Sequence, residues 1–149
     1  MGRLSREARA KQEAKDQKLR QLVLYLAERS QNDQTFGAAK QNKLLLYSDF
    51  LAYISFGQSI TDQQYSRVPN GPAPKRWPRI KANMLAQGDI AIQAFPHDRT
   101  VALRKPDLSI FTPGQIQLVD QILEMHRSKS AAEITADPRV PGCRPNGKK

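Results

Sequence analysis

Apolar residues recur at helical spacing along much of the chain, and they predict which helices are solvated and which are buried. Residues 5–20 are strong helix formers with almost no apolar stripe, which predicts a solvated, fraying helical extension. From Leu19 an apolar face appears on a helix that we expect to end near Asn32. Apolar residues cover most of a further helix predicted over residues 38–56, so it should be the buried central helix. Gly57 suits its C-terminal cap, where a positive φ is commonly needed.

Capping motifs predict two more helix starts. Thr61 and Gln64 fit a capping box, and Ile60 and Tyr65 are placed to pack across it as a hydrophobic staple. The same device recurs at the start of residues 111–127, where a threonine cap, a proline and a glutamine follow in order. We therefore expect one helix to begin after Thr61 and another to fill most of residues 111–127.

The remaining segments predict shorter elements. Three prolines and a glycine make residues 68–74 a stiff turn, and a helix is predicted over 77–86. Alternating apolar residues predict two strands of a hairpin at 90–95 and 101–104, and a short helix is expected at 130–135. A lone hairpin is marginal in water, so it should pack on the helices. The predicted fold is mainly α with a small β-hairpin, an α+β domain with a winged-helix-like order of elements.

Residues 43–74 carry four short motifs in a fixed order. A helix with lysine, leucines, a tyrosine and an aspartate comes first, followed by Gly-x-x-Ile-Thr, a tyrosine and Gly-Pro-x-Pro. Together these motifs resemble the SocA-like antitoxin family, also called the Panacea domain, over roughly residues 20–144. The residues that carry the resemblance are Lys43, Leu44, Leu45, Tyr47, Asp49, Gly57, Ile60, Thr61, Tyr65, Gly71, Pro72 and Pro74. At its end the chain departs from the family pattern, with Cys143 where a tryptophan is usual.

The resemblance implies a toxin–antitoxin system of a prokaryote or phage. Such proteins bind a toxin partner directly, and at least one type hands its toxin to a cytoplasmic protease. It therefore implies an antitoxin or a proteolytic adaptor that sequesters a toxin encoded nearby through a protein–protein surface. No chemistry and no cofactor would be needed.

The net charge of +10 is concentrated at the two ends of the chain. Residues 1–20 contribute +4 and residues 138–149 another +4, which leaves the body nearly neutral. Basic ends of this kind bind nucleic acid weakly through phosphates, or simply solvate the chain. We expect a partly disordered basic helical extension at 1–18, a domain at 19–137 and a basic flexible tail at 138–149.

No membrane or export signal is evident. No stretch approaches the ~20 apolar residues of a membrane span, because Asp49 interrupts the best candidate. The N-terminus lacks the apolar core of a signal peptide. A single cysteine, Cys143, allows no internal disulfide. We expect a cytoplasmic protein with no membrane partner.

The strongest candidate for a partner-binding surface is a cationic segment around the one tryptophan. Lys75, Arg76, Arg79 and Lys81 surround Trp77 with no acid between them. This pattern suits phosphate binding with the indole stacked on a base, or docking onto an acidic protein with the indole as an anchor. It equally suits a solvated face with Trp77 in the core.

Several motif residues have both a structural and a functional interpretation. Tyr47 and Asp49 could form a partner-contact pair, or Asp49 could be a buried acid satisfied by a nearby helix start or turn. Lys43 could pair with an acid or extend along the surface. Gly71 and Pro72 are expected to be structural, because they supply a rigid turn.

The composition offers little for catalysis. His97 and His126 are the two histidines, and nothing supplies a further metal ligand at useful spacing. No catalytic triad, phosphate-binding loop or paired-carboxylate motif is present. We expect neither an enzyme nor a metal or cofactor site.

A winged-helix DNA-binding regulator is the alternative function. Three helices followed by a hairpin is the winged-helix order, and the cationic segment lies where a recognition helix would begin. Against this, the hairpin loop around Asp98 is weakly basic. The two functions can coexist, because antitoxins often repress their own operons.

Overall fold

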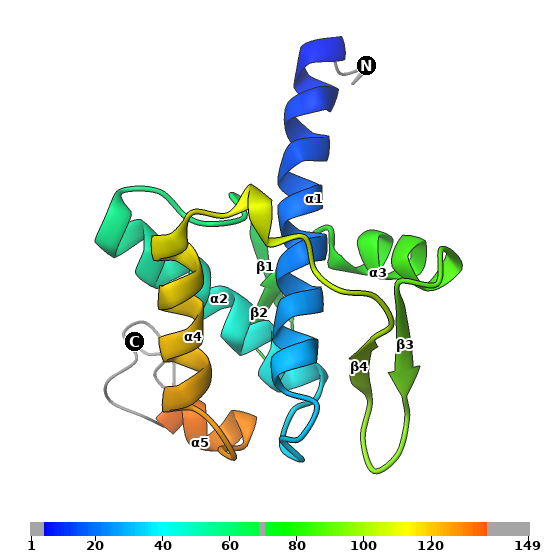
Figure 1. The fold of residues 1–149 in the computed structure, drawn as a ribbon, viewed down its shortest axis with the longest axis vertical. Coiled ribbons are helices and arrows are strands. Elements are labelled where there is room, and N and C mark those ends of the chain that lie inside the picture. The colour runs from blue at the N-terminus through cyan, green and yellow to red at the C-terminus, as the bar shows by residue number, and fades with distance from the viewer. Residues whose placement is uncertain (1–4, 69–70, 137–149) are drawn as a thin grey trace.

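Helix α1 (Arg6–Arg29) is the longest element, and the others pack around its C-terminal half. The computed structural model describes residues 5–68 and 71–136, and the tail predicted at 138–149 lies outside them. Figure 1 shows the N-terminal turns of α1 standing clear of the other elements. The predicted extension and the predicted first core helix are thus one continuous helix. It ends at Arg29 instead of near Asn32.

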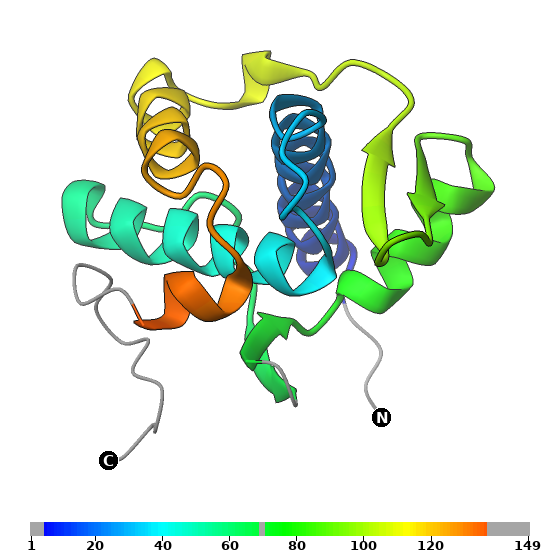
Figure 2. The same cartoon turned by 90° about the horizontal axis from the view of Figure 1, so that it is seen from below.

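Helix α2 (Ala38–Phe56) has the predicted bounds, and Gly57 caps it with a φ of 82°. Its middle is buried, but Tyr53, Ile54 and Phe56 are 60%, 63% and 50% exposed. The prediction of burial nearly all round is therefore wrong for the last turn. In Figures 1 and 2 this end of α2 lies at the outer edge of the molecule, where few elements cover it.

The segment after α2 differs from the prediction. Strands β1 (Tyr65–Val68) and β2 (Gly71–Pro74) pair antiparallel, with Tyr65 opposite Pro74. Residues 57–64 are irregular, so the helix start predicted at Thr61 and Gln64 is wrong. The reason is a long-range contact, because the Asp49 carboxylate on α2 accepts from the Thr61 amide, which Gln64 would bind in a capping box.

The next elements follow the sequence closely. Helix α3 (Trp77–Ala86) has the predicted bounds, and β3 (Ile90–Gln93) pairs antiparallel with β4 (Arg99–Ala102). Strand β3 ends two residues before the predicted end, and β4 lies two residues earlier than predicted, because Gln93 pairs with Arg99. Three helices precede this hairpin, as the winged-helix order requires, with β1–β2 inserted between α2 and α3. The mainly helical α+β class is confirmed, with a second small hairpin that the sequence did not predict.

The chain continues through a 3₁₀ helix, η1 (Leu108–Ile110), to α4 (Pro113–Met125) and α5 (Ala131–Ala136). The capping box at α4 is confirmed. The Thr112 hydroxyl accepts from the Gln115 amide at 3.1 Å, and the Gln115 side chain accepts from the Thr112 amide at 3.0 Å.

The core surrounds the C-terminal half of α1. Figure 2 views α1 nearly end-on, with α2 and α4 on one side and α3 with β3–β4 on the other. Burying apolar side chains from all of these elements is the main stabilising term. The buried apolar residues include Leu19, Leu22, Val23, Leu26, Phe36, Leu44, Leu45, Ile60, Ile80, Met84, Ile90, Val119 and Ile122.

Candidate functional site

Asp49 holds the irregular segment that follows α2. One carboxylate oxygen accepts from the backbone amides of Ile60 and Thr61 at 3.0 and 2.8 Å. The other accepts from the Thr61 and Tyr65 hydroxyls, both at 2.6 Å. The acid therefore fixes residues 60–65 against α2, as expected for a buried acid satisfied by a turn.

The electrostatics of this cluster fit a structural role. Burial raises the pKa of the Asp49 carboxyl above its ordinary value, although the four hydrogen bonds from Ile60, Thr61 and Tyr65 oppose the shift. Burial also raises the pKa of the Tyr65 phenol, and the neighbouring carboxylate raises it further. Both groups are enclosed by their own chain and bonded to each other, so neither faces a substrate.

The remaining motif residues lie in α2, in its cap and in the β1–β2 hairpin. Leu44, Leu45 and Tyr47 are buried, and the Tyr47 ring centroid lies 5.8 Å from that of His126. Gly71 has a φ of 113°, and a Cβ placed on it would lie 3.4 Å from the Lys43 amine. The other members lie in the cap or the hairpin: Gly57, Pro72 and Pro74.

The cationic segment 75–81 is partly used by the fold itself. The Arg76 guanidinium binds Asp16 of α1 through two parallel contacts, Nε to Oδ1 at 3.0 Å and Nη2 to Oδ2 at 2.9 Å. Asp16 is only 3% exposed and also accepts from the side chains of Gln63 and Gln12. Burial acts to raise the Asp16 pKa, but these hydrogen bonds lower it on balance.

The other members of this segment differ in exposure. Trp77 is half-buried and packs against the core, which favours the interpretation that it stabilises the fold. Lys75 and Arg79 are exposed, and Lys81 is half-buried. The structure brings these cations together at the start of α3. It does not present the indole as a free stacking platform.

Sequence reasoning missed a buried lysine cluster at the α1–α2 loop. Lys40 is 2% exposed, and its amine donates to Asp33 at 2.7 Å, to Thr35 at 2.8 Å and to the His126 carbonyl at 2.8 Å. Burial acts to raise the pKa of Asp33, but hydrogen bonds from Lys40, Thr35 and Ser128 lower it to about 2. The signal available in the sequence was the Asp-x-Thr spacing, which is typical of a turn.

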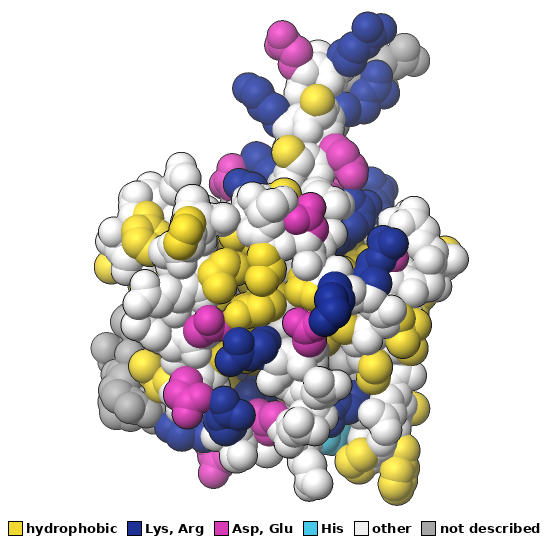
Figure 3. Space-filling model, in the orientation of Figure 1, with side chains coloured by type: hydrophobic (Ala, Val, Ile, Leu, Met, Phe, Trp, Pro, Cys, Tyr) yellow, Lys and Arg dark blue, Asp and Glu magenta, His cyan; other side chains and the backbone are white. Residues whose placement is uncertain are grey.

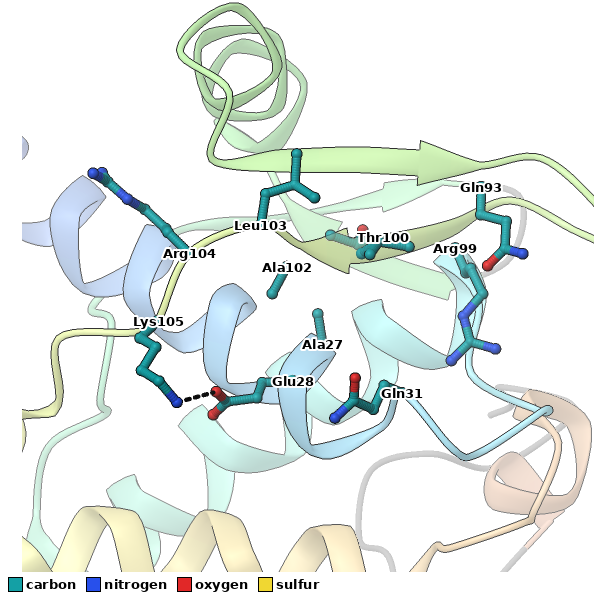
Figure 4. Close-up of a pocket in the computed structure, with 11 residues that line it drawn as sticks. Ala27, Glu28, Gln31, Gln93, Arg99, Thr100, Ala102, Leu103, Arg104 and Lys105 are labelled. Carbon is teal, nitrogen blue, oxygen red and sulfur yellow. Dashed lines mark ion pairs between the residues drawn. The ribbon is translucent and has the colours of Figure 1, made fainter.

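A groove of about 360 Å³ lies between the C-terminal end of α1 and β4 (Figure 4). Its cations are engaged by the protein. Arg99 donates to the Ser30 carbonyl at 2.7 Å, and Arg104 pairs with Asp89 at 3.0 Å. Lys105 lies 3.8 Å from Glu28. The groove therefore presents paired charges and no nucleophile–base pair.

The described residues contain neither a metal-binding cluster nor a membrane-spanning helix. Within residues 5–68 and 71–136, no group of three or more His, Cys, Asp or Glu side chains is placed to hold a metal ion. His97 lies 3.0 Å from the Phe36 carbonyl and fixes the β3–β4 loop. In the same ranges, no helix has the length and apolar character that crossing a bilayer requires. Cys143 lies outside the described residues.

Comparison with known proteins gives one match. The family model described as antitoxin SocA-like, Panacea domain, matches residues 42–136. That range begins in α2 and includes the Asp49 cluster, both hairpins and the helices up to α5. Neither the curated proteins nor the solved structures gave a match.

Proposed function

Because this chain belongs to the SocA-like antitoxin family, whose Panacea domain spans residues 42–136, we propose that it neutralises a toxin by direct protein–protein binding. The family match is the observation that carries the proposal. In the cell the chain would act in the cytoplasm, on a toxin encoded nearby. Residues 19–137 would form the binding domain.

The geometry supports sequestration over catalysis. The polar motif residue best suited to chemistry, Asp49, is buried and accepts four hydrogen bonds from its own chain. The groups available to a binding partner are exposed cations and exposed apolar side chains on the surface. Such surfaces bind proteins without turning over a substrate.

The decisive experiment uses the neighbouring open reading frame. Its product should arrest growth when expressed alone, and co-expression of this chain should restore growth and co-purify the two proteins. A harmless neighbour, together with a chain that purifies stably without a partner, would contradict the proposal.

Toxin lifetime separates a sequestering antitoxin from a proteolytic adaptor. An adaptor delivers its toxin to a protease, so a pulse-chase should show faster toxin decay when this chain is present. That acceleration should disappear in a strain lacking the protease. Sequestration instead leaves the toxin lifetime unchanged or longer.

DNA binding is the second candidate function, favoured by exposed Lys75 and Arg79 at the start of the third helix. Affinity for duplex DNA should then fall steeply with salt, and Lys75→Ala with Arg79→Ala should flatten that slope. Arg76 is unsuitable for this test, because its loss would leave Asp16 buried without its cation. If neutralising the basic residues of both ends, with Asp16 kept in place, abolishes all DNA binding, the winged-helix function is excluded.

A further inference from the structure

The last turn of α2 presents large apolar side chains to solvent. Tyr53, Ile54 and Phe56 are each at least half exposed, and Figure 3 shows hydrophobic side chains gathered over this end of the helix. One turn earlier, on the side of α2 that carries Tyr53 and Phe56, Asp49 and Ala52 are buried. That side of α2 therefore continues beyond the elements that cover it. Contiguous apolar surface of this kind marks interaction sites more often than a single exposed leucine does.

A hollow of about 390 Å³ borders this apolar turn and is lined by cations of α1. Its lining includes Lys15 and Lys18 of α1, Tyr53 of α2 and residues 57–62. Lys15 pairs with Asp62 at 3.3 Å, with 38% and 73% of the two side chains exposed. An ion pair this exposed adds little to the stability of the fold. Lys15 can therefore leave Asp62 and pair with an acidic side chain of a binding partner.

The α1 segment above the hollow is also basic. Figure 3 shows Lys and Arg side chains along the part of α1 that stands clear of the body. Two of its acids are already engaged, because Glu13 pairs with Arg20 at 2.9 Å and Asp16 with Arg76. The positive field beside the apolar turn is therefore only partly neutralised by the chain itself.

Phe56 extends the surface towards α4. A Cβ placed on Gly114 would lie 3.4 Å from the edge of the Phe56 ring, which is van der Waals distance, so the ring lies against the first turn of α4. The ring is held on one side and open to solvent on the other. A pre-positioned aromatic side chain loses little conformational freedom when a partner covers it.

We infer that Tyr53, Ile54 and Phe56, with Lys15 and Lys18 beside them, form the surface that docks the toxin, and we call it the α2 shoulder. Its occupant is an acidic segment of the toxin that carries a large apolar side chain. The inference rests on the proposed function and adds the location and the partner chemistry. The aromatic turn supplies the dry centre of the interface, and the lysines supply the charged rim.

The chemistry of the α2 shoulder disfavours two other occupants. A nucleic-acid backbone would pair with the lysines but would leave Ile54 and Phe56 without apolar partners. A second copy of the chain, docked symmetrically, would bring the basic α1 segments of both copies together, and like charges oppose such docking. An acidic, apolar protein segment satisfies both halves of the surface.

The apolar half is tested with Tyr53→Ala combined with Phe56→Ala, using titration calorimetry with the co-encoded toxin. We expect at least about tenfold weaker binding and loss of growth rescue, because exposed aromatic anchors dominate interfaces of this kind. Phe95→Ala is the matched control, since Phe95 is 83% exposed on the β3–β4 loop. It should bind like the wild type, and thermal unfolding should confirm that all variants are folded.

The cationic half is tested by charge reversal. Lys15→Glu with Lys18→Glu should slow association several-fold and weaken its dependence on salt. Lys75→Glu with Arg79→Glu serves as the competing surface and should leave binding intact. If the second pair abolishes binding while the first pair and the aromatic variants do not, the toxin docks on residues 75–81 and the inference is wrong.

Other outcomes would also overturn the inference. One is a wild-type dimer, detected by light scattering, that the Tyr53→Ala and Phe56→Ala double variant does not form. If that variant still binds the toxin normally, the α2 shoulder is a self-association surface. If the wild type itself neither binds nor neutralises the co-encoded protein, the proposed function fails, and the inference falls with it. Normal binding by wild type and shoulder variants alike refutes the inference alone.

Discussion

Asp49, Lys40 and Asp16 are charged side chains with almost no exposed surface, and each bonds to groups from distant parts of the chain. Asp49 joins α2 to residues 60–65, Lys40 joins α2 to the end of α4, and Asp16 joins α1 to the start of α3. Buried charges need partners, so removing any one group leaves several others unsatisfied. These residues therefore fix the relative positions of the elements.

Asp49 provides the clearest single-residue prediction. Asp49→Ala should lower the free energy of unfolding by about 3 kcal/mol, because two amides and two hydroxyls lose their acceptor. Asp49→Asn should cost only about 1 kcal/mol, since the Thr61 and Tyr65 hydroxyls can turn to accept from the new amide. Urea denaturation checks both values. Equal losses for the two variants would contradict this account of the cluster.

At this scale the sequence could predict that Asp49 is a satisfied buried acid, but it could not identify the donors. Thr61 has two chemically reasonable uses, a local helix cap or a contact with an acid twelve positions away. Local pattern favours the cap, and only the folded arrangement of α2 against residues 60–65 decides for the contact. Arg76 is a similar case, because its partner Asp16 lies sixty positions away.

The elements themselves were more predictable than their partners. The bounds of α2 and α3 and the capped start of α4 follow from periodicity, caps and prolines, which act within a few residues. The β1–β2 hairpin was missed because three prolines in residues 68–74 favour a turn. Among the described residues these short strands pair only with each other, and proline is tolerated in such edge strands.

The end of α2 allows a test of its cap. Gly57→Ala should lower the free energy of unfolding by about 1 kcal/mol, because Gly57 has a φ of 82° that alanine adopts only with strain. The new methyl group meets no atom within 4 Å, so backbone strain alone is measured. Gly114→Ala is the matched control and should be neutral or slightly stabilising, because its φ is not in the left-handed region. Thermal unfolding of the two variants compares them directly.

For the whole molecule, acid should weaken the fold through Asp33. Its pKa of about 2 lies below the ordinary value of 3.8, so its stabilisation is complete above pH 4 and is lost as the pH falls towards 2. The expected loss is about 2 kcal/mol. Asp16, whose pKa is also lowered, acts in the same direction, whereas Asp49 opposes it because burial raises its pKa.

Asp33→Asn isolates this contribution. Urea denaturation between pH 5 and pH 2 should show a shallower decline in stability for the variant than for the wild type. The variant should start less stable at pH 5, because the Lys40 amine loses a charged acceptor. Parallel pH profiles for the two proteins would show that Asp33 does not carry the acid sensitivity.

The surface of the whole molecule was the least predictable part. Because apolar residues cover most of the circumference of α2, the sequence predicted a fully buried helix. The exposure of each turn of α2, however, depends on how far the neighbouring elements extend along it. Tyr53 and Phe56 emerge at the surface because α2 is longer than the body that covers it. The cationic segment 75–81 is visible in the sequence, but its division into paired and exposed members required the position of α1.

The cluster at Lys40 has a further chemical consequence. Acylation of a lysine, by an enzyme or by a reagent, needs an accessible amine, and the Lys40 amine is enclosed and held by three acceptors. Folded protein should resist the reaction at this position, whereas exposed amines such as that of Lys75 should react freely. An acyl group found on Lys40 would therefore indicate that the chain was unfolded when the modification occurred.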